Sequence, residues 1–374
     1  MKKPTYTSFP AEGVSSRTQS ILTWVSLACV LLFPAAAHAQ LPTPTYGWNL
    51  GNTLEALPNE GAWGGPATQS LINSVAAAGF NAVRIPCAWD SHVVNQRTHQ
   101  IDPAYMARVK QVVDWCYAKN LCVEINCHWD GGWFDSSGFA RVDKNVKAKV
   151  QSYWTQIANT FKNYDSKLLF ACANEPDVNT QAETNVLLQY YQVFVNTVRA
   201  TGGQNTTRWL VLSGPSTNID YAYDWFNTLP SDPTPGRLMV EVHYYSPYQF
   251  CLMTSDADWG LMAYFWGQGY HSASLPSRNS TWGEEDYMLA EFQKMQSKFT
   301  SKGIPVILGE YHATKRVGYA DLPAGTEYNR HLASRTYFHK TASDMANSAG
   351  LKPFYWDTPG GFFDWSNGAM LDPD

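Results

Sequence analysis

The stretch LLFACANEPDVN, residues 168–179, joins an apolar run to a group of polar side chains. Residues 168–173 are apolar or small, as in a strand that is buried on both faces, and Asn174, Glu175 and Pro176 end the run. A carboxylate in such a place costs desolvation free energy unless it is paired or used in chemistry. The stretch therefore predicts a buried strand that carries an ionisable group to one edge of a sheet.

The same arrangement repeats along the chain. Short apolar runs cover residues 46–50, 82–86, 121–126, 168–173, 209–212, 238–243, 306–309 and 353–356, and helical patterns cover 102–119, 144–164, 183–200, 283–302 and 326–348. This alternation predicts an α/β protein, a single-domain (β/α)8 TIM barrel. A doubly wound open sheet is the second candidate, but the glycine-rich phosphate turn that usually follows its first strand is missing.

The N-terminal region has the pattern of an export signal. Lys2 and Lys3 precede an apolar stretch at 21–33, and Ala37-His38-Ala39 has the form of a cleavage site. We expect residues 1–39 to be a signal peptide, 40–45 a short linker and 46–374 the barrel domain, in a secreted or periplasmic protein without a membrane anchor after cleavage. No helical pattern follows the run at 353–356, so either the last barrel helix is lacking or the barrel closes differently.

Composition narrows the function further. The chain carries a net charge of −5 and no basic run, which argues against nucleic acid as a partner. Its 15 Trp and 21 Tyr exceed what a core requires, so we expect some of the rings to line a cleft. Beyond the signal, six cysteines permit disulfides, although three of them (Cys87, Cys127 and Cys172) lie in or beside apolar runs and are equally well explained as buried thiols. No cysteine or histidine spacing matches a zinc site.

Polar and aromatic side chains gather at the ends of the predicted strands. In a (β/α)8 barrel the carboxyl ends of the strands meet at one face, where the chemistry takes place. Six of the predicted strands end in groups of this kind: Arg84, His128, Asn174 with Glu175, His243 with Tyr245, Glu310, and Trp356. We expect these side chains to form one site.

Glu175 and Glu310 are the candidate catalytic pair, because the fourth and seventh strands face one another across the barrel mouth. Two carboxyl groups about 5–5.5 Å apart are the requirement of a retaining glycosidase, one as acid/base and one as nucleophile. At this distance one pKa should rise, and we expect Glu175 to be buried, to hold the proton and to bond Asn174 and His243. Arg84 can hold Glu310 ionised. The alternative is a structural ion pair between Glu310 and Arg84.

The ordered motifs resemble glycoside hydrolase family 5 of clan A. They are GWNLGNTLEA (47–56), GFNAVRIP (79–86), CHWD (127–130), ANEP (173–176), VHYY (242–245), LGEY (308–311) and FYWD (354–357). The resemblance implies that Glu175 is the acid/base and Glu310 the nucleophile. It also implies that Arg84, His128, Asn174, His243, Tyr245 and Trp356 complete the site, and that no metal and no cofactor are used. NLGNTLEA followed by EGAWGGP is similar to the endoglucanase and xyloglucanase branch.

The sequence therefore predicts a secreted, retaining endo-β-1,4-glucanase that acts as a monomer on β-glucan polysaccharide or cello-oligosaccharides. A xyloglucanase, lichenase or β-mannanase would use the same two carboxylates. A non-catalytic carbohydrate-binding protein would lack one of them, and a serine hydrolase would need a G-x-S-x-G elbow, which is missing. Candidate platforms for flanking sugars are Trp63, Trp89, Trp129, Trp133 and Trp266, at least half of which could instead be core residues.

Overall fold

The computed structural model describes residues 41–43 and 45–372. The export signal expected at residues 1–39 lies outside the described residues. Within the described part, no helix is both long enough and apolar enough to cross a membrane.

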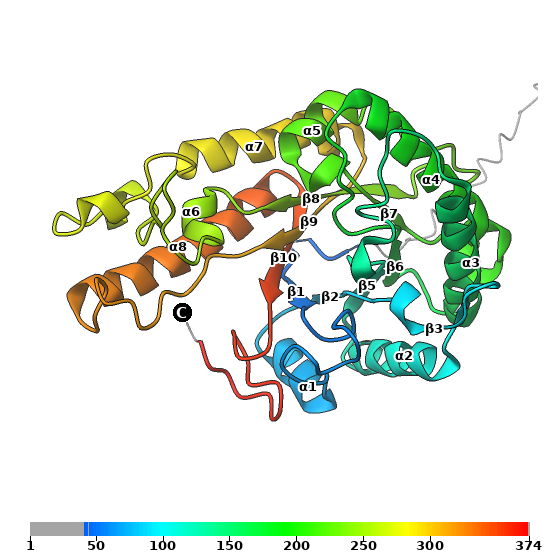
Figure 1. The fold of residues 1–374 in the computed structure, drawn as a ribbon, viewed down its shortest axis with the longest axis horizontal. Coiled ribbons are helices and arrows are strands. Elements are labelled where there is room, and N and C mark those ends of the chain that lie inside the picture. Colours follow the sequence, from blue (N-terminus) through cyan, green and yellow to red (C-terminus); the bar gives the residue numbers. More distant parts are fainter. Residues whose placement is uncertain (1–40, 44, 373–374) are drawn as a thin grey trace, which may run out of the picture. The chain divides into compact units, whose positions relative to one another are not determined.

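Eight parallel strands close into a barrel, which confirms the predicted fold (Figure 1). The barrel closes because the first strand pairs with the last, with Gly47 opposite Phe354. Around the barrel the strands are β1 (Gly47–Leu50), β2 (Ala82–Ile85), β5 (Cys122–Asn126), β6 (Leu168–Ala171), β7 (Leu210–Ser213), β8 (Leu238–Tyr244), β9 (Val306–Tyr311) and β10 (Leu351–Asp357). A separate antiparallel hairpin consists of β3 (Val93–Asn95) and β4 (Gln100–Ile101).

Helices connect the strands. The predicted ones are α2 (Pro103–Ala118), α3 (Lys144–Phe161), α4 (Gln181–Ala200), α7 (Glu285–Lys298) and α8 (Thr326–Ser348). Asp102 caps α2 by accepting a hydrogen bond from the Ala104 N–H, and Pro103 occupies the first turn, where its missing N–H costs nothing. Three shorter helices gave no clear period in the sequence: α1 (Gln69–Ala77), α5 (Ile219–Trp225) and α6 (Tyr248–Cys251).

The barrel interior has an apolar floor and a charged layer above it. Ala82, Cys122 and Met239 belong to the floor, and Leu41 packs into the same cluster, so the described part of the expected linker contacts the barrel. Side chains two residues apart on a strand share a face. The next inward positions of β2, β5 and β8 are therefore Arg84, Glu124 and Glu241, all fully buried. This layer lies directly beneath the carboxyl ends of the strands.

Strand β9 has a bulge at Gly309. Val242 of β8 pairs with Leu308 whereas His243 pairs with Glu310, so Gly309 is the extra residue. A Cβ atom at Gly309 would lie 1.9 Å from Glu241 Oε1, and the Gly309 carbonyl accepts a hydrogen bond of 2.8 Å from the Asn49 amide. The bulge thus makes room for Glu241 and lets two successive residues, Gly309 and Glu310, face the interior.

An irregular segment follows β10, and residues 358–372 contain no helix. Trp365 packs against Trp48 of β1 with ring centroids 5.7 Å apart. Hydrogen bonds run from the hydroxyls of Thr68 and Ser70 to the carbonyls of Trp365 and Asn367. In Figure 1 this red segment lies beside α1. The barrel therefore closes through β1 and β10, and a non-helical segment covers α1 and Trp48.

All six cysteines of the described chain are buried and unpaired, namely Cys87, Cys116, Cys122, Cys127, Cys172 and Cys251. Burial raises the pKa of the Cys116 thiol, for example, so these groups stay protonated. The sequence allowed either disulfides or buried thiols, and the structure has buried thiols.

Candidate active site

The structure brings the predicted site residues together at the carboxyl ends of the strands. Arg84 comes from β2, His243 from β8, Glu310 from β9 and Trp356 from β10. Asn174 and Glu175 follow β6, His128 follows β5 and Tyr245 follows β8. The expectation of a single site at this face agrees with these positions.

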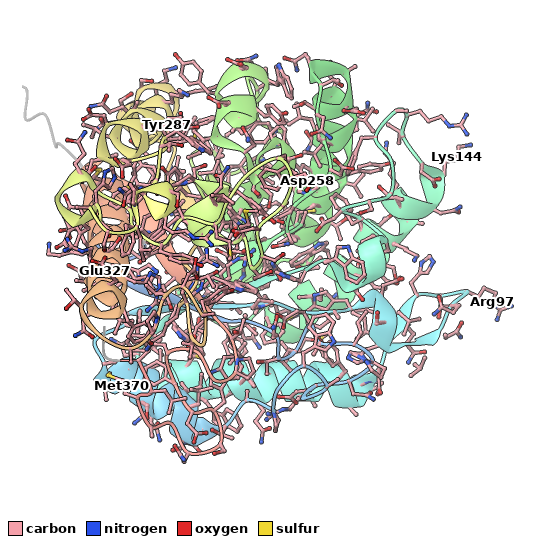
Figure 2. The ribbon with its side chains drawn as sticks, turned by 60° about the vertical axis from the view of Figure 1, so that its left-hand side comes forward. Arg97, Lys144, Asp258, Tyr287, Glu327 and Met370 are labelled. Atoms are coloured by element: carbon pink, nitrogen blue, oxygen red, sulfur yellow. The ribbon has the colours of Figure 1, made fainter. Side chains whose placement is uncertain are left out.

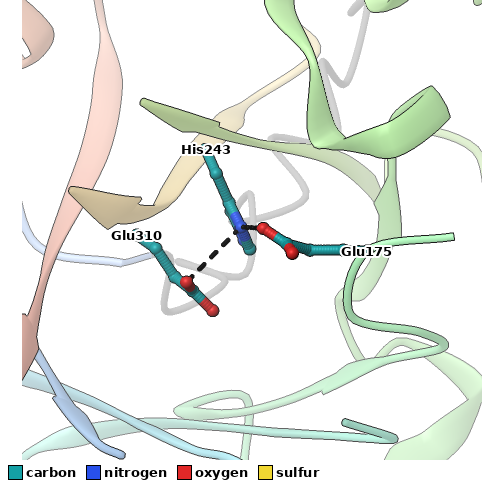
Figure 3. Close-up of side chains that lie close together, drawn as sticks. All are labelled: Glu175, His243 and Glu310. Carbon is teal, nitrogen blue, oxygen red and sulfur yellow. Dashed lines mark hydrogen bonds and ion pairs between the residues drawn. The ribbon is translucent and has the colours of Figure 1, made fainter. Parts of the chain in front are cut away.

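Glu175, His243 and Glu310 form a compact cluster at the barrel mouth (Figure 3). His243 Nδ1 lies 2.6 Å from Glu175 Oε1 and 3.6 Å from Glu310 Oε2. The three side chains each offer an atom within 4.8 Å of the others, so the two carboxylates have the close spacing of a retaining pair. Such a cluster resembles a metal site. Here, however, His243 Nδ1 is engaged in the hydrogen bond to Glu175.

Arg84 organises the site from below. Its Nη1 lies 2.9 Å from Glu310 Oε1, and its Nη2 donates to Asn174 Oδ1 at 2.7 Å. Its Nε lies 3.0 Å from Glu241 and 3.2 Å from Glu124. The donors of a guanidinium lie in one fixed plane, so Arg84 can hold the Glu310 carboxylate and the Asn174 amide in fixed positions relative to each other. The ion pair between Arg84 and Glu310, which was the alternative role for Glu310, is present as one contact of this network.

The structure corrects the prediction for Glu175. Its side chain is 46% exposed rather than buried. Desolvation acts to raise the pKa of Glu175, but the hydrogen bond and positive charge of His243 outweigh it, and the pKa falls below its usual value. The bond to His243 was predicted correctly, whereas Asn174 bonds Arg84. In the substrate-free protein, Glu175 is therefore the ionised partner.

His243 holds the proton instead. Burial alone would lower the pKa of His243, but the charge of Glu310 and the hydrogen bonds to Glu175 and Glu241 raise it to about 10. His243 Nε2 lies 3.2 Å from Glu241 Oε1, so the imidazolium bridges the mouth and the charged layer beneath it.

The remaining predicted residues surround this centre. The Tyr245 hydroxyl donates to Glu310 Oε2 at 2.8 Å, and burial, then the Glu310 charge, raises the pKa of Tyr245, so it remains a donor. The rings of His128 and Trp356 are stacked with centroids 5.7 Å apart. Burial, then the Arg84 charge, lowers the pKa of His128, so its imidazole is neutral. Trp356 is partly exposed at the carboxyl end of β10.

Four acidic residues near the centre were missed. Glu124 and Glu241 are fully buried beside Arg84. Asp135 accepts a hydrogen bond from the Glu175 N–H, and burial raises its pKa to about 7. Glu55 accepts from the Thr53 N–H, and burial raises its pKa to about 8. The sequence did offer a signal for Glu124 and Glu241. Each is a single charged residue within an apolar run, in VEIN and VEVH.

The predicted tryptophan platforms divide into three groups. Trp89 and Trp266 are fully buried, and each indole N–H donates to a backbone carbonyl, so neither can present a ring face to a sugar and these two predictions are wrong. Trp133 is partly buried and packs edge-on against Tyr153. Trp63 and Trp129 are exposed. Two other exposed tryptophans, Trp259 and Trp282, were not among the candidates.

Two carboxylates this close, at the end of a parallel barrel where such folds place their chemistry, are typical of a retaining glycoside hydrolase. The family model for cellulase, glycosyl hydrolase family 5, matches residues 44–360. Endoglucanase A of Paenibacillus barcinonensis is 35% identical over 83% of this chain and 80% of its own length.

Solved structures give the same result. A family 5 xyloglucan-specific β-1,4-glucanase from a ruminal metagenomic library, solved in complex with XXLG, is 41% identical with a TM-score of 0.78, covering 87% of this chain and 90% of that one. A broad-specificity endoglucanase from Bacteroides salanitronis is 34% identical with a TM-score of 0.77, covering 89% of this chain and 93% of that one. The chain belongs to glycosyl hydrolase family 5, a family of retaining O-glycosyl hydrolases.

Proposed function

We propose that the protein cleaves internal β-1,4 linkages of glucan chains, with Glu310 as nucleophile and Glu175 as acid/base. The observation that carries the proposal is the spacing of the two carboxylates, which offer oxygens within 4.8 Å of one another at the barrel mouth. Arg84 and Tyr245 each bind one oxygen of Glu310, which fixes its orientation. The export pattern at residues 1–39 supports action outside the cytoplasm.

In the first step Glu310 attacks the anomeric carbon, and the bond to the leaving oxygen breaks as that oxygen takes a proton from Glu175. The proton reaches Glu175 from His243 Nδ1 along their 2.6 Å hydrogen bond. Attack neutralises the Glu310 charge that raises the pKa of His243, so the shift becomes easier as the ester forms. In the second step Glu175 accepts a proton from water, the water oxygen displaces Glu310 from the anomeric carbon, and the proton returns to His243 Nδ1 along the same hydrogen bond.

Asn174 and Trp356 position the sugar. Because Asn174 Oδ1 accepts from Arg84, its amide nitrogen is left to donate to the sugar 2-hydroxyl, a contact that strengthens in the transition state. Trp356 offers a flat apolar face beneath the pyranose ring at the cleavage position.

The test removes each carboxylate in turn. We expect Glu175→Ala and Glu310→Ala to lose activity on carboxymethylcellulose by about 10²–10⁴-fold or more while the thermal melting curve remains cooperative. Azide should restore activity to Glu310→Ala, because a small anion can replace the nucleophile. Asp224→Ala, which removes an exposed carboxylate, is the control and should retain activity. Substantial activity remaining in either glutamate variant would contradict the assignment.

Xyloglucan is the second candidate substrate, because a relative at 41% identity is xyloglucan-specific. Initial rates on carboxymethylcellulose, lichenan, xyloglucan and glucomannan would separate the two. A rate on xyloglucan well above the other three would assign the chain to that substrate.

A further inference from the structure

Two exposed tryptophans lie on the long connection between β8 and α7. Trp259 is 66% exposed and Trp282 is 44% exposed, although a large aromatic ring is usually well buried. Tyr248 adds a third exposed ring, 6.0 Å from Trp259. Figure 2 labels Asp258, the chain neighbour of Trp259, on this connection and Tyr287 on α7. Connections this long are uncommon unless they have a function.

Trp259 and Trp282 line a pocket of about 290 Å³, close to the lower size limit of small-molecule sites. We call it the aromatic pocket; its lining includes Pro247, Gln249, Trp259, Asn279, Ser280 and Trp282. The Trp282 indole N–H donates to Gln249 Oε1 at 3.2 Å, which fixes the ring. Ser280 is 5% exposed, and its hydroxyl has no partner among the described residues. A buried hydroxyl without a partner indicates a place for a hydrogen-bonding ligand.

The aromatic pocket adjoins the catalytic centre. A second pocket contains Glu175, His243, Ser246 and Tyr287. Trp282 packs edge-on against Tyr287, with ring centroids 5.6 Å apart, and Pro247 directly follows Ser246. The linings of the two pockets are therefore in contact, through Trp282 with Tyr287 and through Ser246 with Pro247.

The order of the strands in the barrel indicates which part of the substrate would lie over the aromatic pocket. Trp356 is on β10 on one side of β9, whereas both pockets involve residues after β8 on the other side of β9. If Trp356 supports the sugar that Glu310 attacks, the aromatic pocket lies on the side of the leaving group, which Glu175 protonates.

We propose that the aromatic pocket binds a pyranose unit in the leaving-group part of a glucan. Trp259 and Trp282 would pack against the apolar faces of the ring, and the Ser280 hydroxyl would bond a sugar hydroxyl. This rests on the proposed function, because it assumes that the chain enters the site past Glu175. It implies that the enzyme needs substrates extending several units beyond the cleaved bond.

The test compares a long and a short substrate for Trp259→Ala, Trp282→Ala and Ser280→Ala. We expect kcat/KM on cellohexaose to fall by about tenfold for each tryptophan variant, the loss of one large aromatic contact. On 4-nitrophenyl β-cellobioside, whose leaving group contains no pyranose unit for the pocket to bind, kcat/KM should stay within about twofold, since the chemistry is unchanged. Tyr223→Ala, which removes an exposed ring on α5 that lines neither pocket, is the control.

The cleavage position gives a readout that a purely structural role would not change. With cellohexaose labelled at its reducing end, loss of a leaving-group contact should move cleavage toward that end, so the labelled product becomes shorter. Equal losses on both substrates, no loss on cellohexaose, or a longer labelled product would overturn the proposal. Wild-type enzyme inactive on both substrates would instead refute the proposed function, and the pocket assignment with it.

Discussion

The proton that rests on His243 is shared with Glu175 along their hydrogen bond, so its loss with rising pH is a property of the pair. Both sites within the 2.6 Å contact can hold it, and the negative charges around His243 raise the pKa of that residue to about 10. The alkaline limb of activity should therefore report loss of this shared proton. A lone carboxyl at Glu175 would lose its proton at lower pH.

His243→Gln tests this view. The variant keeps a hydrogen-bonding side chain but cannot carry the positive charge, so we expect the alkaline limb of kcat/KM to move to lower pH. Rates measured from pH 4 to 10 on an oligosaccharide with a poor leaving group would check it. Glu241→Gln, which removes one of the charges that support the imidazolium, should move the limb in the same direction by less. An alkaline limb unchanged in His243→Gln would contradict the shared proton.

Glu124 and Glu241 are a second buried pair, each with one oxygen that lacks a donor in the described structure, Glu124 Oε2 and Glu241 Oε2. One proton held between the two carboxyls would satisfy both oxygens. Burial, then the Glu241 charge, raises the pKa of Glu124, which makes Glu124 the protonated member.

We expect Glu124→Gln to retain near wild-type stability and pH profile, because an amide mimics the protonated carboxyl. Glu124→Ala should cost about 3–5 kcal/mol in the free energy of unfolding, since it removes one partner of Arg84 and of Glu241 from a fully buried network. Denaturant unfolding compares the two variants. If Glu124→Gln is as unstable as Glu124→Ala, Glu124 is ionised and the shared proton does not exist.

At the level of the elements, the bulge in β9 controls the direction of Glu310. Gly309 is required there because a side chain would meet Glu241, which is itself held by Arg84 and His243. The bulge in β9 therefore couples the direction of Glu310 to the position of the buried Glu241.

Gly309→Ala should lower activity strongly and destabilise the fold by about 1–3 kcal/mol, because the new methyl group forces Glu241 from its place. Gly269→Ala is the matched control: a Cβ there has nothing within 4 Å, and we expect little change. Activity and denaturant unfolding of the two variants give the comparison. Full activity in Gly309→Ala would show that Glu310 does not depend on the bulge.

The strands and the residues at their ends could be predicted because apolar runs and the polar groups that end them are local in sequence. The bulge at Gly309 was not predictable, since it depends on the pairing of β9 with β8. Glu124 and Glu241 lie within apolar runs, and only the pairing of the strands in the barrel shows that both face Arg84. Trp89 and Trp266 were misassigned because the burial of a ring depends on tertiary packing, which composition does not report.

At the scale of the described chain, closure of the barrel leaves none of its eight strands with a free edge. The charged layer and the catalytic residues come from strands all around that ring, so the site exists only when the ring is complete. The buried thiols need no oxidant for the fold to form.

Closure of the barrel also sets the timing of biosynthesis. Gly47 pairs with Phe354, so β1 must wait for roughly 300 residues to be made, about 15–60 s at typical rates of chain synthesis. Until β10 emerges from the ribosome, β1 and β9 have open edges that can pair with other chains. The nascent chain thus carries open strand edges for most of its synthesis, and aggregation is avoided only if those edges are kept from other chains until β10 has been made.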